Sequence, residues 1–150
     1  MTEDRSYVEE NARELERMRA IVAGADDDAL LVQVNDDWTV AGVLGHIAFW
    51  DARVLSLADK FERGEKLSPD DEPEDVDWIN DASRPLIHAI VPRQAAELAL
   101  RLAEETDLRV ASLPPDRMWP NDPDSPISAF RSAHRGEHLD DIDRALRQPP

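Results

Sequence analysis

The sequence has 150 residues and a mass of 16.9 kDa, and its 17 Lys and Arg against 33 Asp and Glu give a formal net charge of −16. This length fits one domain, residues 1–150, which buries about 70% of its unfolded surface without a disulfide or structural metal. The acidic charge argues against nucleic acid as a partner, because binding it needs a basic surface. The absence of cysteine excludes disulfides and thiolate ligands.

The N-terminal residues, MTEDRSYVEENARELERM, are rich in acids, whereas a secretory signal peptide begins with basic residues and an apolar segment. No stretch approaches the roughly 18 consecutive apolar residues that a membrane-spanning helix needs. We therefore expect a cytoplasmic protein without a membrane partner.

A first helix is predicted near the N-terminus. Apolar residues recur there at separations close to three, four and seven: Tyr7, Val8, Leu15, Met18, Ile21 and Val22. This spacing predicts an amphipathic helix that begins near Ser6 and ends near Gly24, since glycine readily terminates helices.

A second helix has the clearest start signal in the chain. Thr39 is a residue type that caps helices, and Trp38 before it is placed to pack against Val43 in the first turn. Helical spacing then continues to about Gly64 through Leu44, Ile47, Trp50, Val54, Leu57, Ala58 and Phe61.

Residues 65–91 interrupt this pattern. The segment SPDDEPEDVD, residues 68–77, contains six acids in ten positions and two prolines, and Pro85 and Pro92 bracket a short apolar run. We expect a long crossover connection with one short helical turn or helix. Long connections in compact domains often cover a functional site, although a solvated acidic loop is the simpler interpretation.

Two more helices are predicted after the crossover. One runs from about Pro92, which suits a first helical turn, to about Ser112. Several prolines then prevent helix formation, and the last helix is expected to begin at Ser125 or Ser128 and to end near Arg147. No segment alternates with period two over a useful length, so the predicted class is all-α with about four main helices.

The last helix contains a histidine pair, His134 and His138, four residues apart. This spacing places both imidazoles on one helix face, one turn apart, as in the helical histidine pairs of zinc enzymes. Phe130 and Ile142 continue the same face, which indicates that the pair points inward. The spacing alone is equally compatible with a chance pair at the surface.

A third histidine, His46, lies in the otherwise apolar segment WTVAGVLGHIAFWD. A buried imidazole without a partner costs about 1–3 kcal/mol, so it must bond to something. One interpretation is a core histidine satisfied by a carbonyl or carboxylate. The other brings His46 to the pair on the last helix, where three imidazoles hold a metal ion and leave positions open for water or substrate.

Glu137 and Asp141 are candidates for residues that orient these ligands. Each lies three residues after one of the paired histidines, where it can accept the free ring N–H of a metal-bound imidazole. The alternative is that both belong to the solvated edge of the helix, where charged residues are common.

Other polar and aromatic residues have simpler interpretations. Trp50 is a candidate for the wall of a pocket or for the core, and Trp78 and Trp119 for pinning the long connections. Asp51 follows His46 by five residues and lies on a different face of an ideal helix. His88 is expected to have a structural role.

Three motifs together resemble the DinB family: Trp38-Thr39, then the segment HIAFWD at residues 46–51, then SAHRGEHL at residues 132–139. The similarity extends from the first helix to about Leu146. It implies a four-helix bundle with up-down-down-up connectivity and a long crossover between helices two and three. It also implies a divalent metal, zinc or nickel among others, bound by His46, His134 and His138.

Mycothiol-dependent maleylpyruvate isomerases, which are related, have Glu where this chain has His134, whereas the three-histidine branch includes bacillithiol S-transferases. The resemblance therefore implies a metal-dependent enzyme that transfers a low-molecular-weight thiol, similar to mycothiol or bacillithiol, to a small electrophile. No side chain is a convincing catalytic base. A homodimer is expected. The alternatives are a non-catalytic metal-binding or dimeric interaction module, and a hydrolase that acts on a reactive small molecule.

Overall fold

The computed structural model describes residues 4–69 and 71–148, and within these ranges it contains helices and connecting segments but no β-strand. The helices are α1 (Tyr7–Gly24), α2 (Asp27–Leu30), α3 (Val40–Glu62), α4 (Pro73–His88), α5 (Pro92–Ser112) and α6 (Arg131–Arg147), with a 3₁₀ turn, η1, at Pro115–Arg117. The predicted all-α class is confirmed.

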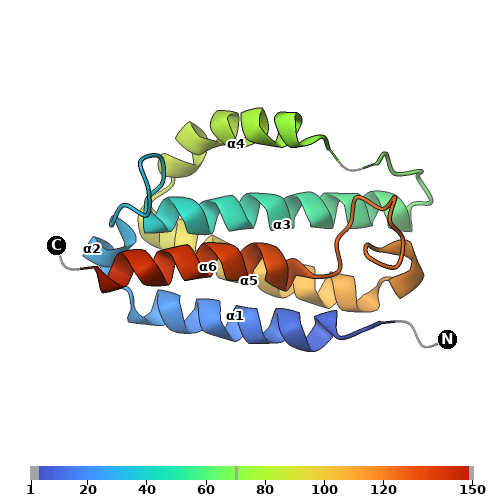
Figure 1. The fold of residues 1–150 in the computed structure, drawn as a ribbon, viewed down its shortest axis with the longest axis horizontal. Coiled ribbons are helices and arrows are strands. Elements are labelled where there is room, and N and C mark those ends of the chain that lie inside the picture. The colour runs from blue at the N-terminus through green and yellow to red at the C-terminus, as the bar shows by residue number, and fades with distance from the viewer. Residues whose placement is uncertain (1–3, 70, 149–150) are drawn as a thin grey trace.

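Four long helices, α1, α3, α5 and α6, lie side by side, and α4 covers the outer side of α3 (Figure 1). The core between the four contains Met18, Leu44, Ile47, Leu139 and Ile142. The residues of α5 that are fully buried in this core are small: Ala96, Ala99 and Ala103. Because they stand at helical spacing, α5 has a low ridge along which α3 packs closely.

The predicted start signals of the first two long helices hold to different degrees. Thr39 is the N-cap of α3, and its Oγ1 accepts a hydrogen bond from the N–H of Gly42 at 2.9 Å. α1 begins at Tyr7, as expected, but the side chain of Ser6 does not cap it. Asp4 instead accepts hydrogen bonds from the backbone N–H and hydroxyl of Ser6 at 2.9 and 2.7 Å.

The crossover at residues 65–91 contains one helix, as expected, but α4 is longer than the short helical turn or helix that the sequence predicts. Pro73 lies in its first turn, where no N–H is needed, and Glu74 and Asp75 follow it at the positive end of the helix dipole. Pro85 lies in the last turn, where it removes one hydrogen bond without ending the helix. Within the acidic segment, residue 70 lies outside the described residues.

The last helix begins later than Ser125 or Ser128. The residues before α6 pair with an earlier segment, since the N–H of Trp119 donates to the carbonyl of Ile127 at 2.9 Å and the N–H of Ala129 donates to the carbonyl of Trp119 at 3.0 Å. The carbonyl of Ile127, which would accept the first hydrogen bond of a helix from Ser128, is thus used by Trp119, and the helix starts at Arg131.

Glycines allow α4 to approach α3 closely. A Cβ atom at Gly45 would lie 2.5 Å from Cγ2 of Ile87, and one at Gly42 would clash with the ring of His88. The Nε2 of His88 accepts the N–H of Thr39 at 3.4 Å, and its ring lies against Trp38. His88 therefore joins the end of α4 to the start of α3, which is a structural role.

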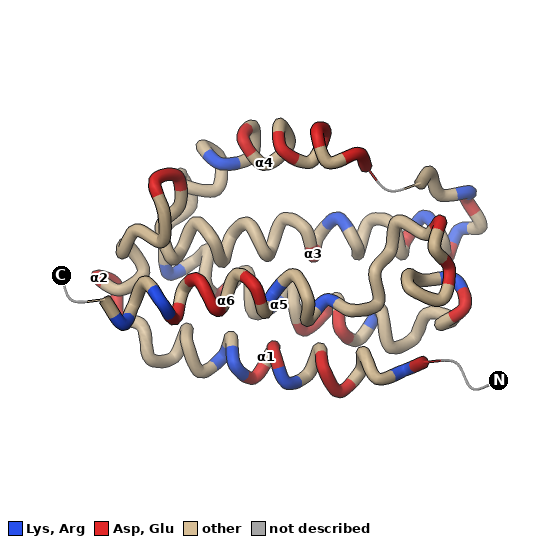
Figure 2. The backbone as a smooth tube through the Cα atoms, viewed as in Figure 1, with Lys and Arg blue, Asp and Glu red and all other residues tan. Residues whose placement is uncertain are grey.

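Charged residues lie on all the long helices and on the connections between them, but the first half of α3 has none (Figure 2). By length and composition alone α3 could cross a membrane, and 61% of its most apolar window is buried inside the molecule. Core helices pass the same test, so this composition also follows from the central position of α3.

Candidate metal centre

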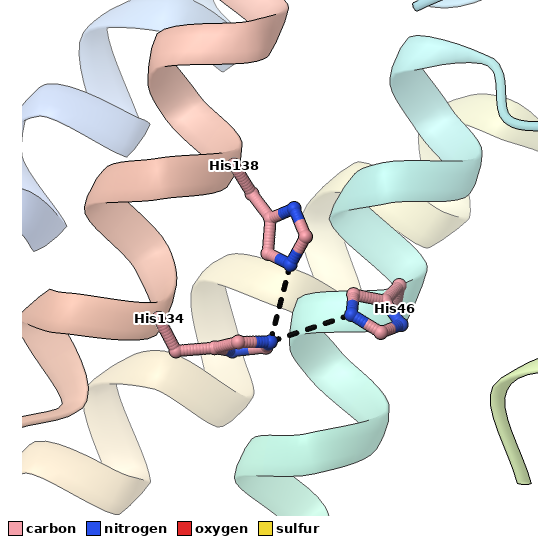
Figure 3. Close-up of side chains that lie close together, drawn as sticks. All are labelled: His46, His134 and His138. Carbon is pink, nitrogen blue, oxygen red and sulfur yellow. Dashed lines mark hydrogen bonds between the residues drawn. The ribbon is translucent and has the colours of Figure 1, made fainter. Parts of the chain in front are cut away.

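α3 and α6 bring three histidines together (Figure 3). The Nε2 of His134 lies 3.3 Å from the Nε2 of His46 and 3.2 Å from the Nε2 of His138. The three residues form a group whose ligand atoms all lie within 4.8 Å of one another. The structure thus realises the second of the two interpretations of His46, in which it meets the pair on the last helix.

Local sequence explains this arrangement. The four-residue spacing of His134 and His138 stacks them on one face of α6, and Leu139 and Ile142 hold the neighbouring part of that helix in the core. His46 lies on the apolar half of α3, which is buried almost throughout. Because the face of α6 with His134 and His138 and the face of α3 with His46 are both packed inward, the three imidazole rings meet.

The distances fit a single bound ion. Nitrogens about 2.0–2.1 Å from a zinc ion at tetrahedral angles lie about 3.3–3.4 Å apart. The separations from His134 to His138 and to His46, 3.2 and 3.3 Å, agree with this value, and all three ligand atoms lie within 4.8 Å of one another. Three ligands from the protein leave at least one position of the ion open, which distinguishes catalytic from structural zinc sites.

Burial keeps the histidines neutral. It lowers the pKa of His46 to about 4, with a smaller contribution from the charge of His138. Burial also lowers the pKa of His134 well below its usual value, and that of His138 despite the opposing effect of Asp141 and Glu137. At neutral pH each ring therefore carries a lone pair, which is the form that binds metal ions.

Hydrogen bonding among the rings is incomplete without a cation. A neutral imidazole has one N–H and one lone pair, so the Nε2 of His134 can donate to only one of its two neighbours. The Nδ1 atoms of His46 and His134 are buried and have no hydrogen-bond partner among the described residues. The three Nε2 atoms cannot all carry a hydrogen, because two N–H groups that face each other do not form a hydrogen bond. If the Nε2 atoms carry lone pairs instead, a cation between them can bind all three.

Neither of the two acids considered as orienting residues bonds to these rings. Glu137 is exposed, and Asp141 forms an ion pair with Arg144 at 3.0 Å. Within residues 4–69 and 71–148, neither forms a hydrogen bond with a histidine, although both act on His138 through their charge. Their role as acceptors for metal-bound histidines stays a prediction.

A cavity of about 400 Å³ opens beside the histidines. Trp50 forms part of its wall, as considered from the sequence, and its Nε1 donates a hydrogen bond to Oδ1 of Asn80 on α4 at 2.8 Å. A smaller cavity of about 170 Å³ also reaches His46, His138 and Asn80. The other two tryptophans that we considered lie elsewhere: Trp78 is exposed on α4, and Trp119 lines a separate cavity of about 570 Å³.

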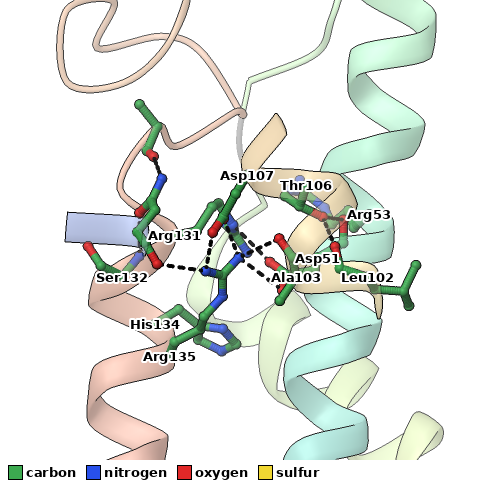
Figure 4. A network of polar contacts seen from close by, with 12 residues as sticks. Asp51, Arg53, Leu102, Ala103, Thr106, Asp107, Arg131, Ser132, His134 and Arg135 are labelled. Atoms are coloured by element: carbon green, nitrogen blue, oxygen red, sulfur yellow. Dashed lines mark hydrogen bonds and ion pairs between the residues drawn. The ribbon is translucent and has the colours of Figure 1, made fainter. Parts of the chain in front are cut away.

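Sequence reasoning missed a buried ion-pair network next to the histidines (Figure 4). Asp51 accepts from Nε of Arg131 at 3.1 Å and pairs with Arg135 at 3.4 Å. Arg135, whose side chain is fully buried, also donates to both oxygens of Asp107, at 2.6 and 3.0 Å. Two carboxylates and two guanidiniums thus neutralise one another at this level of the bundle.

One signal in the sequence could have found this network. Arg131, His134, Arg135 and His138 stand at positions i, i+3, i+4 and i+7, which is the spacing of a buried helix face. A polar stripe at these positions, on a helix whose histidines point inward, predicts that both arginines are buried with them. Buried arginines need acidic partners, which Asp51 and Asp107 supply.

The chain matches the DinB superfamily over residues 10–139. It belongs to the DinB superfamily. The matched region contains all three histidines of the candidate centre, and it confirms the resemblance inferred from the motifs around Trp38, His46 and His134. Comparisons of this DinB-superfamily chain with curated proteins and with solved structures gave no match.

Proposed function

We propose that this DinB-superfamily protein binds one divalent transition metal ion, zinc or nickel, through the Nε2 atoms of His46, His134 and His138. The observation that carries the proposal is the convergence of these atoms from two helices at 3.2 and 3.3 Å. The lowered pKa values of the three rings add support, because metal ions do not have to displace protons at neutral pH.

We further propose that the protein is an enzyme that transfers a low-molecular-weight thiol to a small electrophile. When bound, the metal ion lowers the pKa of a thiol, so that a nucleophilic thiolate is available at neutral pH. The residues beside the histidines supply the rest of the site. Trp50, Val76 and Pro126 supply an apolar part of the wall, and the two adjoining cavities provide separate space for a thiol and an electrophile.

The same proposal includes the up-down-down-up order of a four-helix bundle. It is supported by the direction of the long helices, since α1 and α6 run toward the end of the molecule at which α3 and α5 begin (Figure 1). In this order the crossover containing α4 passes over the side of α3 that carries Trp50. The homodimer and the cytoplasmic location stay predictions.

Metal analysis of the tag-free protein, purified without chelator, tests the proposal. We expect close to one transition metal ion per chain in the wild type and in His88→Ala, which removes the histidine outside the group, and almost none in His46→Ala. A metal-containing protein is then assayed with thiols against epoxides, halides and activated alkenes. Absence of metal after reconstitution with zinc and nickel contradicts the metal site. Turnover without added thiol contradicts thiol transfer and favours a hydrolase.

A further inference from the structure

The larger cavity beside the histidines presents arginine side chains, although the protein as a whole is acidic. Arg53 and Arg131 line this cavity, and its described lining contains no Asp or Glu. Asp51 and Asp71, which pair with these arginines, lie outside this lining, so the wall itself presents guanidinium groups and no carboxylate. Because the groups that face a cavity decide which ligands it holds, guanidinium N–H donors without a carboxylate beside them favour a ligand with anionic oxygens.

Arg131 has unused hydrogen-bond donors in this wall. Its side chain is more than nine-tenths buried, and its Nε is occupied by Asp51 at 3.1 Å. Its Nη1 and Nη2 have no hydrogen-bond partner within the described part of the chain. These two nitrogens are not among the fully buried unpaired atoms, so they are accessible to a ligand, and the two Nη atoms of a guanidinium match the two oxygens of a carboxylate.

Asn80 presents a second donor to the same space. The indole N–H of Trp50 is only a donor, so its hydrogen bond at 2.8 Å fixes the amide oxygen of Asn80 toward Trp50. The Nδ2 group is therefore directed elsewhere, and no described residue accepts from it. Asn80 lines both cavities that reach the histidines, so its N–H groups are placed to meet a ligand.

We infer that this cavity binds a small-molecule carboxylate, held by Nη1 and Nη2 of Arg131 and by Nδ2 of Asn80. Arg53, which pairs with Asp71 at 3.1 Å, contributes a further guanidinium to the wall. Trp50, Val76 and Pro126 contact the apolar part of the ligand. The inference rests on the proposed function, because it takes this cavity as the substrate site. The substrate class that it assigns is a carboxylate with an apolar remainder.

The first test compares benzoate with benzamide, which has nearly the same shape but no charge. Both are titrated by calorimetry into the metal-free full chain, from which the chelator has been removed, so that neither can bind through a metal ion. We expect benzoate to bind with a dissociation constant on the order of a millimolar and at least about ten-fold more tightly than benzamide. Equal affinities, or no benzoate binding, overturn the inference.

Two variants locate the binding site. Asn80→Asp keeps the acceptor for Trp50 but replaces the amide N–H groups by negative charge, and Arg131→Lys keeps the charge beside Asp51 but removes the two-nitrogen fork. Each is expected to weaken benzoate binding by at least about ten-fold. The control is Asn121→Asp, which introduces the same charge at an exposed position and is expected to leave affinity unchanged. Unchanged affinity in Asn80→Asp overturns the inference even if Arg131→Lys fails to fold.

Zinc content separates this inference from the proposed function. All three variants keep His46, His134 and His138, and we expect each to bind as much zinc as the wild type. Selective benzoate binding in a chain that takes up no zinc leaves the carboxylate site in place and contradicts the metal site. Normal zinc content without selective benzoate binding leaves the metal site in place and contradicts the carboxylate site.

Discussion

The Nε of Arg131 donates a hydrogen bond to Oδ1 of Asp51 at 3.1 Å, and the two side chains are only 9% and 1% exposed. Arg131 precedes His134 by three residues on α6, and Asp51 follows His46 by five on α3. The ion pair therefore joins the two helices that supply the histidines, within about one turn of the Nε2 atoms. Arg135, also on α6, donates to the other oxygen of Asp51, so both carboxylate oxygens bond to α6.

Replacing Asp51 by Asn is expected to lower the free energy of unfolding by about 3–5 kcal/mol, because it leaves two buried guanidiniums without this carboxylate. Urea denaturation followed by circular dichroism measures the change. Asp59→Asn is the matched control, since Asp59 pairs with Arg109 at an exposed site and its loss should cost about 0–1 kcal/mol. Similar costs for the two variants would show that the buried pair contributes no more than an exposed one.

The metal-free protein is expected to lose stability as the pH falls from about 6.5 to about 4. The pKa of His46 is about 4 in the folded chain, whereas an exposed histidine in the unfolded chain has a pKa of about 6.5. Between these pH values the unfolded state therefore binds more protons than the folded state. Each histidine with a lowered pKa changes the free energy of unfolding by at most about 1.4 kcal/mol per pH unit in this range. Its contribution to stability is fully present above about pH 6.5.

Thermal or urea unfolding between these pH values, compared with His46→Gln, measures the contribution of His46. The carboxylates titrate in both proteins, so only the difference between the two slopes is informative. A smaller slope in His46→Gln is the expected result. Identical slopes would mean that His46 does not take up its proton on unfolding.

The glycine at position 45 is expected to control the distance between α3 and α4. Gly45→Ala places a Cβ atom 2.5 Å from Cγ2 of Ile87 and should cost about 1–3 kcal/mol, because α4 must shift outward. In Gly136→Ala the new Cβ atom has its nearest neighbour at 3.6 Å, an ordinary contact, so this control should gain up to about 1 kcal/mol from helix propensity. Urea denaturation of both variants measures whether the free energy of unfolding falls in Gly45→Ala and rises in Gly136→Ala.

Trp50→Phe is expected to weaken carboxylate binding without loss of metal. The phenyl ring keeps the apolar wall, but the lost indole N–H no longer fixes the amide of Asn80, whose oxygen can then turn toward the anion. Loss of this orientation should weaken benzoate binding by a few fold, about 3–10-fold. Trp78→Phe is the control, because Trp78 is exposed and bonds to Asp75 outside the cavity. Equal affinities in both variants would show that the orientation of Asn80 contributes nothing.

Features with a local cause could be predicted from the sequence. The cap at Thr39 and the start of α5 at Pro92 each depend on residues within one turn. The pairing of His134 with His138 follows from the helical repeat in the same way. Local signals failed where distant residues decide, since α6 starts late because its preceding segment bonds to Trp119.

The sequence by itself determined the residue types of the candidate site: three histidines on two apolar helix faces, with family motifs around them. Only the tertiary structure decided that His46 meets the pair on α6, because residues 88 positions apart come together through packing of α3 against α6. It also decided the partners of Arg131 and Asp51. Most charges in this acidic chain are solvated, so composition and spacing do not show which few are buried and must therefore pair.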